Sequence, residues 1–135
     1  MDQQITYKIN DEITAEELST VFKRSGIKRP VDDFPRLKRM IDSADVIISA
    51  RDAQHQLVGV ARSLTDYSYC CYLSDLAVDK TYQKNGIGKE LIRLTKEELG
   101  EEVALLLLSS KEAMNYYPRI GFEQIDNGFK IARNR

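Results

Sequence analysis

The sequence predicts a single mixed α/β domain in which helices flank a partly antiparallel sheet. Segments with the two-residue period of strands alternate with segments of helical period, and three strand-like segments follow one another in the middle. The chain has 135 residues, of which 42% are hydrophobic, and no linker-like or repeated stretch divides it. This length suits one core. We therefore expect residues 1–135 to form one domain.

A short strand and a well-marked helix are expected first. Residues 5–9 alternate apolar and polar side chains, as a strand with one buried face does. Thr14 and Glu17 have the spacing of a capping box, which satisfies the first amides of a helix. Gly26 is a suitable C-terminal stop for this helix.

A second helix and three consecutive strands follow. The helix is expected over residues 33–43, where apolar side chains recur at helical spacing. The strands are expected over residues 46–51, 57–64 and 69–78. Short polar turns separate them, so we expect two antiparallel hairpins.

The last third of the chain alternates between helices and strands. We expect a helix over about 86–99, a strand over 103–108, a short helix from about residue 111 and a final strand over 121–131. Residues 103–108 form the longest apolar run, far shorter than the roughly 18 residues that a membrane helix needs. We therefore expect no membrane span.

Composition and charge exclude several classes of function. The net charge of −1 lacks the basic excess typical of nucleic-acid-binding domains. Cys70 and Cys71 are adjacent, so on a strand they point to opposite faces and form neither a disulfide framework nor a metal site. His55 is the only histidine. The polar first ten residues do not resemble a signal peptide. We expect a cytoplasmic protein that binds no metal.

The most informative segment is Gln83-Lys84-Asn85-Gly86-Ile87-Gly88-Lys89, which joins a predicted strand to a predicted helix. A helix start leaves about four amides without intrahelical partners and carries partial positive charge, so it can bind phosphate where glycine permits close approach. Glycine at a helix start also occurs as simple turn chemistry, and both interpretations remain open from the spacing alone. The segment matches neither a P-loop nor a dinucleotide-binding fingerprint.

Two motifs resemble one known family. The stretch from Val78 to Gly88 is similar to the signature of the GNAT superfamily of acyl-CoA-dependent N-acetyltransferases, in which Gln/Arg-x-x-Gly-x-Gly/Ala opens a helix after a strand. The stretch from Ala113 to Phe122 is similar to the Ala-x-x-aromatic-Tyr-x-x-x-Gly-Phe segment of that family. The order of elements agrees over nearly the whole chain. The resemblance implies a GNAT-like fold, with a mixed, mostly antiparallel sheet flanked by helices and two splayed central strands.

The resemblance also implies acetyl-CoA as co-substrate. Its pyrophosphate would lie against the amides between Lys84 and Gly88, and its pantetheine arm would run along the strand that ends at Val78, like an added strand. The cofactor-binding residues that the resemblance implies are Leu76, Ala77, Val78, Gln83, Lys84, Asn85, Gly86, Ile87, Gly88, Lys89 and Tyr116.

Two catalytic roles follow from the same resemblance. The N–H of Val78 would stabilise the oxyanion of the tetrahedral intermediate, and the phenol of Tyr117 would protonate the leaving thiolate. Without the resemblance, Tyr116 and Tyr117 are better interpreted as core residues of an amphipathic helix. Pro118 follows directly and disfavours helical geometry at Tyr117.

Asp75 is the candidate general base, because a carboxylate on an otherwise apolar strand needs a reason. Strict alternation places it on the same face as Cys71, Leu73 and Ala77, and burial of that face would raise the pKa of Asp75. The alternative is a structural carboxylate that caps a helix or pairs with an arginine. The glutamate usual in the family is absent, and Tyr72 stands near its place.

The acceptor amine is the least specified part of the prediction. Arg62, Asp66 and Tyr67 are candidates to bind it, and residues 25–34 are a candidate lip of the site. We expect an N-acetyltransferase that acts on the primary amine of a small molecule, or of a peptide or protein. The alternative is a non-catalytic acyl-CoA-binding sensor or interaction module. A homodimer is a further expectation.

Overall fold

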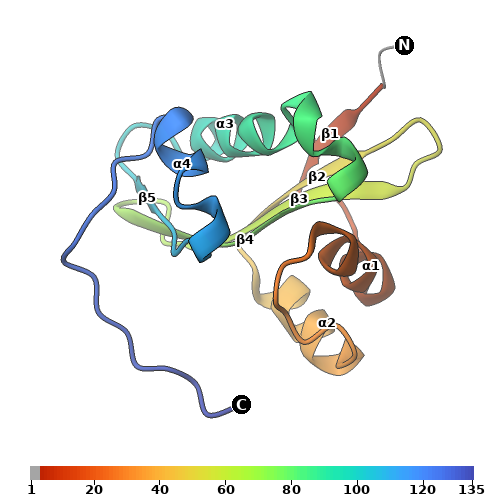
Figure 1. Cartoon of the computed structure of the whole chain (residues 1–135), viewed down its shortest axis with the longest axis horizontal. Helices are drawn as coiled ribbons and strands as arrows, with labels where there is room; N and C mark the ends of the chain where they lie inside the picture. Colours follow the sequence, from red (N-terminus) through yellow and green to blue (C-terminus); the bar gives the residue numbers. More distant parts are fainter. Residues whose placement is uncertain (1–3) are drawn as a thin grey trace.

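The computed structural model describes residues 4–135, apart from the side chain of Lys84, and consists of one five-stranded sheet with helices on both faces (Figure 1). Its helices and strands, in chain order, are β1 (Thr6–Ile9), α1 (Ala15–Ser25), α2 (Phe34–Ser43), β2 (Val46–Arg51), β3 (Leu57–Thr65), β4 (Cys70–Val78), the 3-10 helix η1 (Lys80–Asn85), α3 (Ile87–Leu99), β5 (Ala104–Leu106), the 3-10 helix η2 (Lys111–Ala113) and α4 (Tyr116–Arg119).

The strands lie in the sheet in their order along the chain, β1-β2-β3-β4-β5. The first four pair antiparallel, and β4 and β5 pair parallel. Both predicted hairpins, β2–β3 and β3–β4, are therefore confirmed. The parallel pair has the connection that parallel strands require, because α3 crosses over between them.

The two faces of the sheet carry separate apolar cores. Helices α1 and α2 cover one face, where Leu18 and Phe22 pack with Val60 of β3. Helix α3 covers the other face, where Ile87 and Leu91 belong to the second cluster. Figure 1 shows the sheet between these two layers. All five of these side chains are fully buried, so α3 is held against the sheet from its first turn.

Helix α1 begins as the sequence predicts. The Thr14 hydroxyl accepts a hydrogen bond from the Glu17 amide at 3.0 Å, and the Glu17 carboxylate accepts one from the Thr14 amide at 3.0 Å. Gly26 ends the helix in the left-handed conformation, with a φ of 82°. The capping box and the glycine stop are both confirmed.

The predicted final strand over residues 121–131 is wrong. This segment is neither helix nor strand, and most of its residues are exposed. A strand needs a neighbouring strand to pair its backbone groups. The edge strand closest in sequence to residues 121–131 is β5, and among the described residues β5 pairs only with β4. The alternation of apolar side chains is present in the sequence, but a pairing partner within the described chain is not.

Residues 4–135 contain neither a helix suited to span a membrane nor a cluster of metal-ligating side chains. No helix there combines the length and the apolar character that crossing a bilayer requires. No group of three or more His, Cys, Asp or Glu side chains there is arranged to hold a metal ion.

The close packing of α3 on the sheet depends on Gly59 of β3. A Cβ added to Gly59 would lie 3.0 Å from Ile87 Cγ2 and 3.3 Å from both Ala50 Cβ and Leu91 Cδ1. We expect Gly59→Ala to lower the free energy of unfolding slightly and Gly59→Val to lower it by about 1–3 kcal/mol, because overpacking displaces the helix. Urea denaturation would measure the series. Equal stability of all three proteins would show that α3 does not need this close approach.

Candidate functional site

The corner between β4 and α3 is tied to the end of β4 by side chains of η1 and its cap. The Asp79 carboxylate accepts hydrogen bonds from the amide of Thr81 at 3.0 Å and from its hydroxyl at 2.9 Å. Gln83 Nε2 donates to the carbonyl of Val78 at 3.0 Å. The backbone that leads into α3 is therefore held in a defined position relative to the last residue of β4.

Helix α3 begins without a side-chain cap, unlike α1 and α2. Thr14 and Asp33 cap those two helices, whereas α3 has Gly86 at the N-cap and no side-chain hydrogen bond there. The first intrahelical bond of α3 runs from the amide of Glu90 to the carbonyl of Gly86 at 3.1 Å. The amides of residues 87–89 precede it, so they have no acceptor within the helix. This arrangement suits an anion.

The two glycines of the corner have different structural roles. Gly86 has a φ of 74°, and a Cβ placed on it would meet nothing within 4 Å, so space lies open beside the helix start. A Cβ on Gly88 would lie 2.7 Å from the hydroxyl oxygen of Tyr116. Gly88 therefore allows α4 to approach α3 closely, a role that spacing alone did not indicate.

The side chains around the helix start differ in exposure and charge. Ile87 is fully buried, so only its backbone is available at the corner, and Lys89 is exposed. Glu90 is the one acidic residue in the first turn of α3, and Arg93 binds both of its carboxylate oxygens, at 2.7 and 2.8 Å. This pairing offsets a charge that would otherwise repel an anion. The predicted contribution of the Lys84 side chain lies outside what the structure describes.

Strands β4 and β5 pair only where they begin. Residues Cys70, Cys71 and Tyr72 pair with Ala104, Leu105 and Leu106. Beyond this point β4 continues for six residues to Val78, while β5 has ended. The splay between the central strands, which the family resemblance implied, is therefore present.

The backbone of β4 presents hydrogen-bonding groups on the side that β5 leaves open. The amide of Asp79 donates to the carbonyl of Val58 in β3 at 2.8 Å. Because successive residues of an antiparallel strand direct these groups to alternate sides, the N–H groups of Val78 and Leu76 point away from β3. Gln83 already occupies the Val78 carbonyl. The Val78 amide thus faces the splay, as its predicted role requires.

Helix α4 accommodates Pro118 because the helix is a single turn. Pro118 is its third residue, where a backbone N–H would have no intrahelical acceptor in any case. The carbonyl of Tyr117 accepts hydrogen bonds from the amides of Ile120 and Phe122, both at 3.1 Å. The ring of Tyr117 packs edge-on against Phe122, with centroids 5.5 Å apart. These contacts hold Tyr117 in the apolar cluster beneath α3.

The electrostatic surroundings of Tyr117 favour a protonated phenol. Burial raises the pKa of Tyr117 above its usual value, the neighbouring Tyr116 raises it further, and the positive charge of Arg29 opposes the shift. Burial also raises the pKa of Tyr116. Both hydroxyls therefore carry their protons at neutral pH, and that of Tyr117 can donate one.

Asp75 is fully buried and forms ion pairs with two arginines. Its Oδ1 accepts from Arg29 Nε and its Oδ2 from Arg62 Nε, each at 2.5 Å. Both arginines also donate to Ser74. Arg29 Nη2 donates to the Ser74 carbonyl oxygen at 2.7 Å, and Arg62 Nη2 donates to the Ser74 hydroxyl oxygen at 3.0 Å. These contacts match the alternative interpretation of Asp75 as a structural carboxylate that pairs with arginine. The role of Asp75 as general base stays a prediction.

A β-bulge changes the face on which Asp75 lies. Strand β3 pairs with Leu73 and then with Asp75, so that Ser74 is an extra residue in β4. Cys71 and Leu73 pack in the cluster beneath α3, whereas Ala77 packs beneath α1 and α2. Asp75 meets Arg29 from the loop between those two helices. The prediction that Asp75 shares a face with Cys71 and Leu73 is therefore wrong, because strict alternation assumed an unbroken strand.

Arg29 is a site residue that the sequence analysis missed. It lies in the loop between α1 and α2, the segment predicted as a lip, and its guanidinium anchors this loop to β4. The signal in the sequence was the carboxylate of Asp75 on an apolar strand, which calls for a cation. Local pattern could not choose that cation, because the partner lies 46 positions away.

The predicted acceptor-binding residues are not assembled in one place. Asp66 Oδ1 accepts from the amides of residues 68–70 at 2.8 to 3.1 Å, which closes the β3–β4 turn and lowers the pKa of Asp66. Tyr67 donates its hydroxyl to the carbonyl of Asp45 at 3.1 Å. This turn precedes the first residue of β4, which lies about 26 Å from Val78 at roughly 3.3 Å per residue. Arg62, by contrast, is buried beside Asp75.

Known proteins share this architecture. The CoA complex of the aminoglycoside N-acetyltransferase AAC(6')-Iy has a TM-score of 0.72 and 14% identity, over 100% of this chain and 98% of that one. The CoA complex of YhbS from Escherichia coli has a TM-score of 0.72 and 19% identity, over 91% and 71%. At these identities the likeness shows the fold alone.

Sequence comparison extends the likeness to a family. The chain is 28% identical over 116 residues to "GCN5-related N-acetyltransferase 2, chloroplastic" of Arabidopsis thaliana, which covers 84% of this chain and 45% of the relative. The chain spans about half the length of the first curated relatives that it matches. A family model described as "Acetyltransferase (GNAT) domain" matches residues 10–132. The chain therefore belongs to the GNAT acetyltransferase family.

Proposed function

We propose that the protein transfers an acetyl group from acetyl-CoA to the primary amine of a small molecule. One observation carries this proposal: the uncapped start of α3 follows, through η1, a strand whose outward amides face the splay between β4 and β5. An anion site in line with a strand edge fits a ligand that has a diphosphate and an extended, amide-containing arm. The two structural neighbours that bind CoA share this fold and support the same ligand.

The residues present have the chemistry that binding of acetyl-CoA requires. The amides of residues 87–89 would hold the pyrophosphate, which would approach across the open space beside Gly86. Lys89, which is exposed, would add positive charge. The backbone of Leu76 and Val78 would pair with the pantetheine amides, in the position that a neighbouring strand would take. Bound acetyl-CoA would supply a thioester whose carbonyl carbon accepts the amine.

Two groups of this chain would then act on the reacting atoms. As the amine nitrogen bonds to the carbonyl carbon, the Val78 amide would donate to the oxygen that becomes negative. As the carbon–sulfur bond breaks, the Tyr117 phenol would give its proton to the departing sulfur, which leaves CoA as a thiol. The bonded nitrogen would release one proton to water, and water would return a proton to the Tyr117 oxygen. A tyrosine phenol is protonated at neutral pH at its ordinary pKa, and burial raises the pKa of Tyr117 further, so the proton is available to the sulfur.

The Asp75 carboxylate is better suited to positioning than to taking a proton. Each of its two oxygens accepts a hydrogen bond from a guanidinium group, so neither oxygen faces an amine directly. We assign it the role of holding Arg29, and with it the loop between α1 and α2, against β4. The proton of the attacking ammonium would then leave through water.

An assay with a panel of amines tests the proposed function. Calorimetry would first measure the binding of acetyl-CoA and CoA. Release of free thiol would then be followed with a polyamine, an amino acid, an arylalkylamine, an aminoglycoside and a lysine-containing peptide. Turnover with a small amine supports the proposal, and turnover with the peptide alone would move the substrate to proteins. Binding of acetyl-CoA without turnover on any amine would identify an acyl-CoA sensor instead.

Removal of the Tyr117 hydroxyl should affect turnover far more than cofactor binding. We expect Tyr117→Phe to lower kcat by about 10²-fold, the lower range for general acid catalysis, while the Kd for CoA stays near the wild-type value. Tyr116→Phe is the matched control and should retain most of its turnover. Steady-state kinetics and calorimetry would measure both. Equal losses of kcat and affinity in Tyr117→Phe would argue against the acid role.

Substitution of Gly86 should weaken cofactor binding specifically. We expect Gly86→Val to raise the Kd for CoA at least about tenfold, because the side chain would strain a left-handed residue and fill the approach to the α3 amides. Gly100→Val is the control: Gly100 also has a positive φ, 82°, and open space around it, but it ends α3. The Gly100→Val protein should lose stability as Gly86→Val does, but its Kd for CoA should stay near the wild-type value. Unchanged affinity in Gly86→Val would contradict the pyrophosphate assignment.

Loss of the Asp75 carboxylate should destabilise the protein. We expect Asp75→Ala to lower the free energy of unfolding by about 3–5 kcal/mol, because it leaves the buried Arg62 without its partner. Asp42→Ala removes an exposed ion pair with Lys38 and should change stability by less than about 1 kcal/mol. Thermal denaturation would compare them. A stable but inactive Asp75→Ala protein would restore Asp75 as the general base.

A further inference from the structure

The charge cluster around Asp75 is not neutral. The guanidinium groups of Arg29 and Arg62 share the single carboxylate of Asp75, two positive charges against one negative, so the cluster has a net charge of +1. Asp75 and Arg62 are both buried, so little water can solvate this charge. An uncompensated charge in such surroundings is unfavourable. A further anion bound to the cluster would therefore be stabilised.

Arg29 is the member of the cluster that a ligand can reach. Its side chain is 28% exposed, against 7% for that of Arg62. A guanidinium group has five N–H donors, and the described chain uses three of those of Arg29. Nε donates to Asp75, Nη1 donates to the carbonyl of Lys28 and Nη2 donates to the carbonyl of Ser74. One N–H on each Nη atom thus has no acceptor among residues 4–135, and two such donors suit the two oxygens of a carboxylate.

The side chains nearest to Arg29 in the loop between α1 and α2 add positive charge. Lys28, the preceding residue, is exposed. Lys80 of η1 extends to the start of this loop, because a Cβ placed on Gly26 would lie 3.1 Å from Lys80 Nζ. Positive charges at the approach to a site favour the encounter with an anion. The surroundings of Arg29 therefore favour an anionic ligand.

The acidic residues of the same loop do not neutralise Arg29. They are Asp32 and Asp33, and both are exposed. Asp33 caps α2, where its carboxylate accepts from the amide of Arg36 at 3.1 Å. Among the described residues, Asp75 is the only carboxylate that forms an ion pair with Arg29. A cationic ligand would find no free carboxylate bound to this guanidinium group to receive it.

Arg29 lies close to the proposed reaction centre. Burial raises the pKa of Tyr117 and the positive charge of Arg29 opposes this shift, an effect that weakens with distance. Asp75, which binds Arg29, lies three residues before Val78 in β4. At about 3.3 Å per residue the two are roughly 10 Å apart along the strand. A ligand that reaches from the thioester to Arg29 therefore needs several bonds between its amine and its anionic group.

We propose that the acceptor carries a carboxylate, which binds the two N–H groups of Arg29 that lack an acceptor, several carbon atoms away from the reacting amine. This inference rests on the proposed acetyl transfer and narrows its substrate to amines with an anionic group, such as ω-amino acids and amino acids with a side-chain amine. The bound carboxylate would bring the charge of the cluster to zero. Polycationic amines would be poor acceptors, because the guanidinium group would repel them.

Three acceptors of matched length test the charge preference. ω-Aminohexanoate, hexylamine and hexamethylenediamine share one reacting amine and differ at the other end, which is a carboxylate, a methyl group or an ammonium. Thiol release would measure kcat/KM for each. We expect kcat/KM for aminohexanoate to exceed that for hexylamine at least about tenfold, because hydrogen bonds between charged groups contribute on this scale. The diamine should be the poorest acceptor. Butyl and octyl series would cover other spacings.

Variants locate the carboxylate at Arg29. Arg29→Gln leaves Asp75 paired with Arg62, and it should bring the ratio of kcat/KM for aminohexanoate and hexylamine close to one. Arg29→Lys keeps the charge but loses the planar pair of donors, so its ratio should be intermediate. Lys28→Glu changes an exposed side chain outside the buried cluster and should also lower the ratio. Circular dichroism would confirm that each variant is folded.

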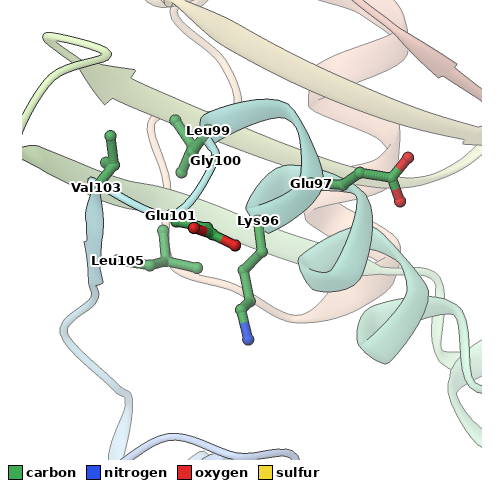
Figure 2. Close-up of a pocket in the computed structure, with 7 residues that line it drawn as sticks. All are labelled: Lys96, Glu97, Leu99, Gly100, Glu101, Val103 and Leu105. Carbon is green, nitrogen blue, oxygen red and sulfur yellow. The ribbon is translucent and has the colours of Figure 1, made fainter.

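Lys96→Glu is the matched control. Lys96 is also exposed, but it borders an apolar cavity at the far end of α3 (Figure 2). Reversal of its charge should leave the ratio unchanged. A fall in the ratio as large as that in Lys28→Glu would show a general effect of net charge and overturn the assignment to Arg29.

The remaining outcomes separate this inference from the proposed function. Turnover that does not favour the acid in any of the three series would overturn the inference and leave acetyl transfer standing. A preference that persists in folded Arg29→Gln and in Lys28→Glu would place the carboxylate elsewhere and equally overturn it. If no amine is acetylated, calorimetry of the CoA complex with aminohexanoate still decides: binding that Arg29→Gln or Lys28→Glu weakens supports the site, and absence of binding overturns it.

Discussion

The separation of β5 from β4 after Tyr72 is the constraint on which the rest of the structure depends. Every backbone N–H and C=O needs a hydrogen-bonding partner, and from this point the outer side of β4 has no neighbouring strand. From the end of β4 the chain continues through η1 to the uncapped start of α3. The fold therefore places a row of unpaired donors and a positively polarised helix start in one line, and a long ligand with an anionic group can satisfy both.

The same region shows how the fold positions a loop with a buried charge. The bulge at Ser74 turns Asp75 toward α1 and α2, where it meets Arg62 from β3 and Arg29 from the loop between the helices. Removal of one partner from a buried ion pair leaves an uncompensated charge and destabilises the fold. The stability of this network therefore depends on all three side chains together. The positive charge of Arg29 also lowers the pKa of Tyr117, against the larger effect of burial, which raises it.

Local signals in the sequence predicted most of the fold. The capping box at Thr14, the glycine stop at Gly26 and the polar turns between β2, β3 and β4 act over a few residues, so they can be interpreted without the tertiary structure. The motif around Gly86 identified the corner for the same reason. The errors arose where the outcome depends on distant partners: the orientation of Asp75, which a bulge reverses, and the final strand, which finds no neighbour among residues 4–135.

The sequence by itself determined the order of the main helices and strands as far as α4, the family, and the glycine corner, because each is encoded in the periodicity and spacing of neighbouring residues. Only the tertiary structure decided that Arg29 and Arg62 share Asp75, that Gly88 makes room for Tyr116, and that the last apolar alternation stays unpaired. These outcomes depend on contacts between residues far apart in the chain. Such contacts leave no local pattern, because they are selected by packing and by the pairing of charges after the chain has folded.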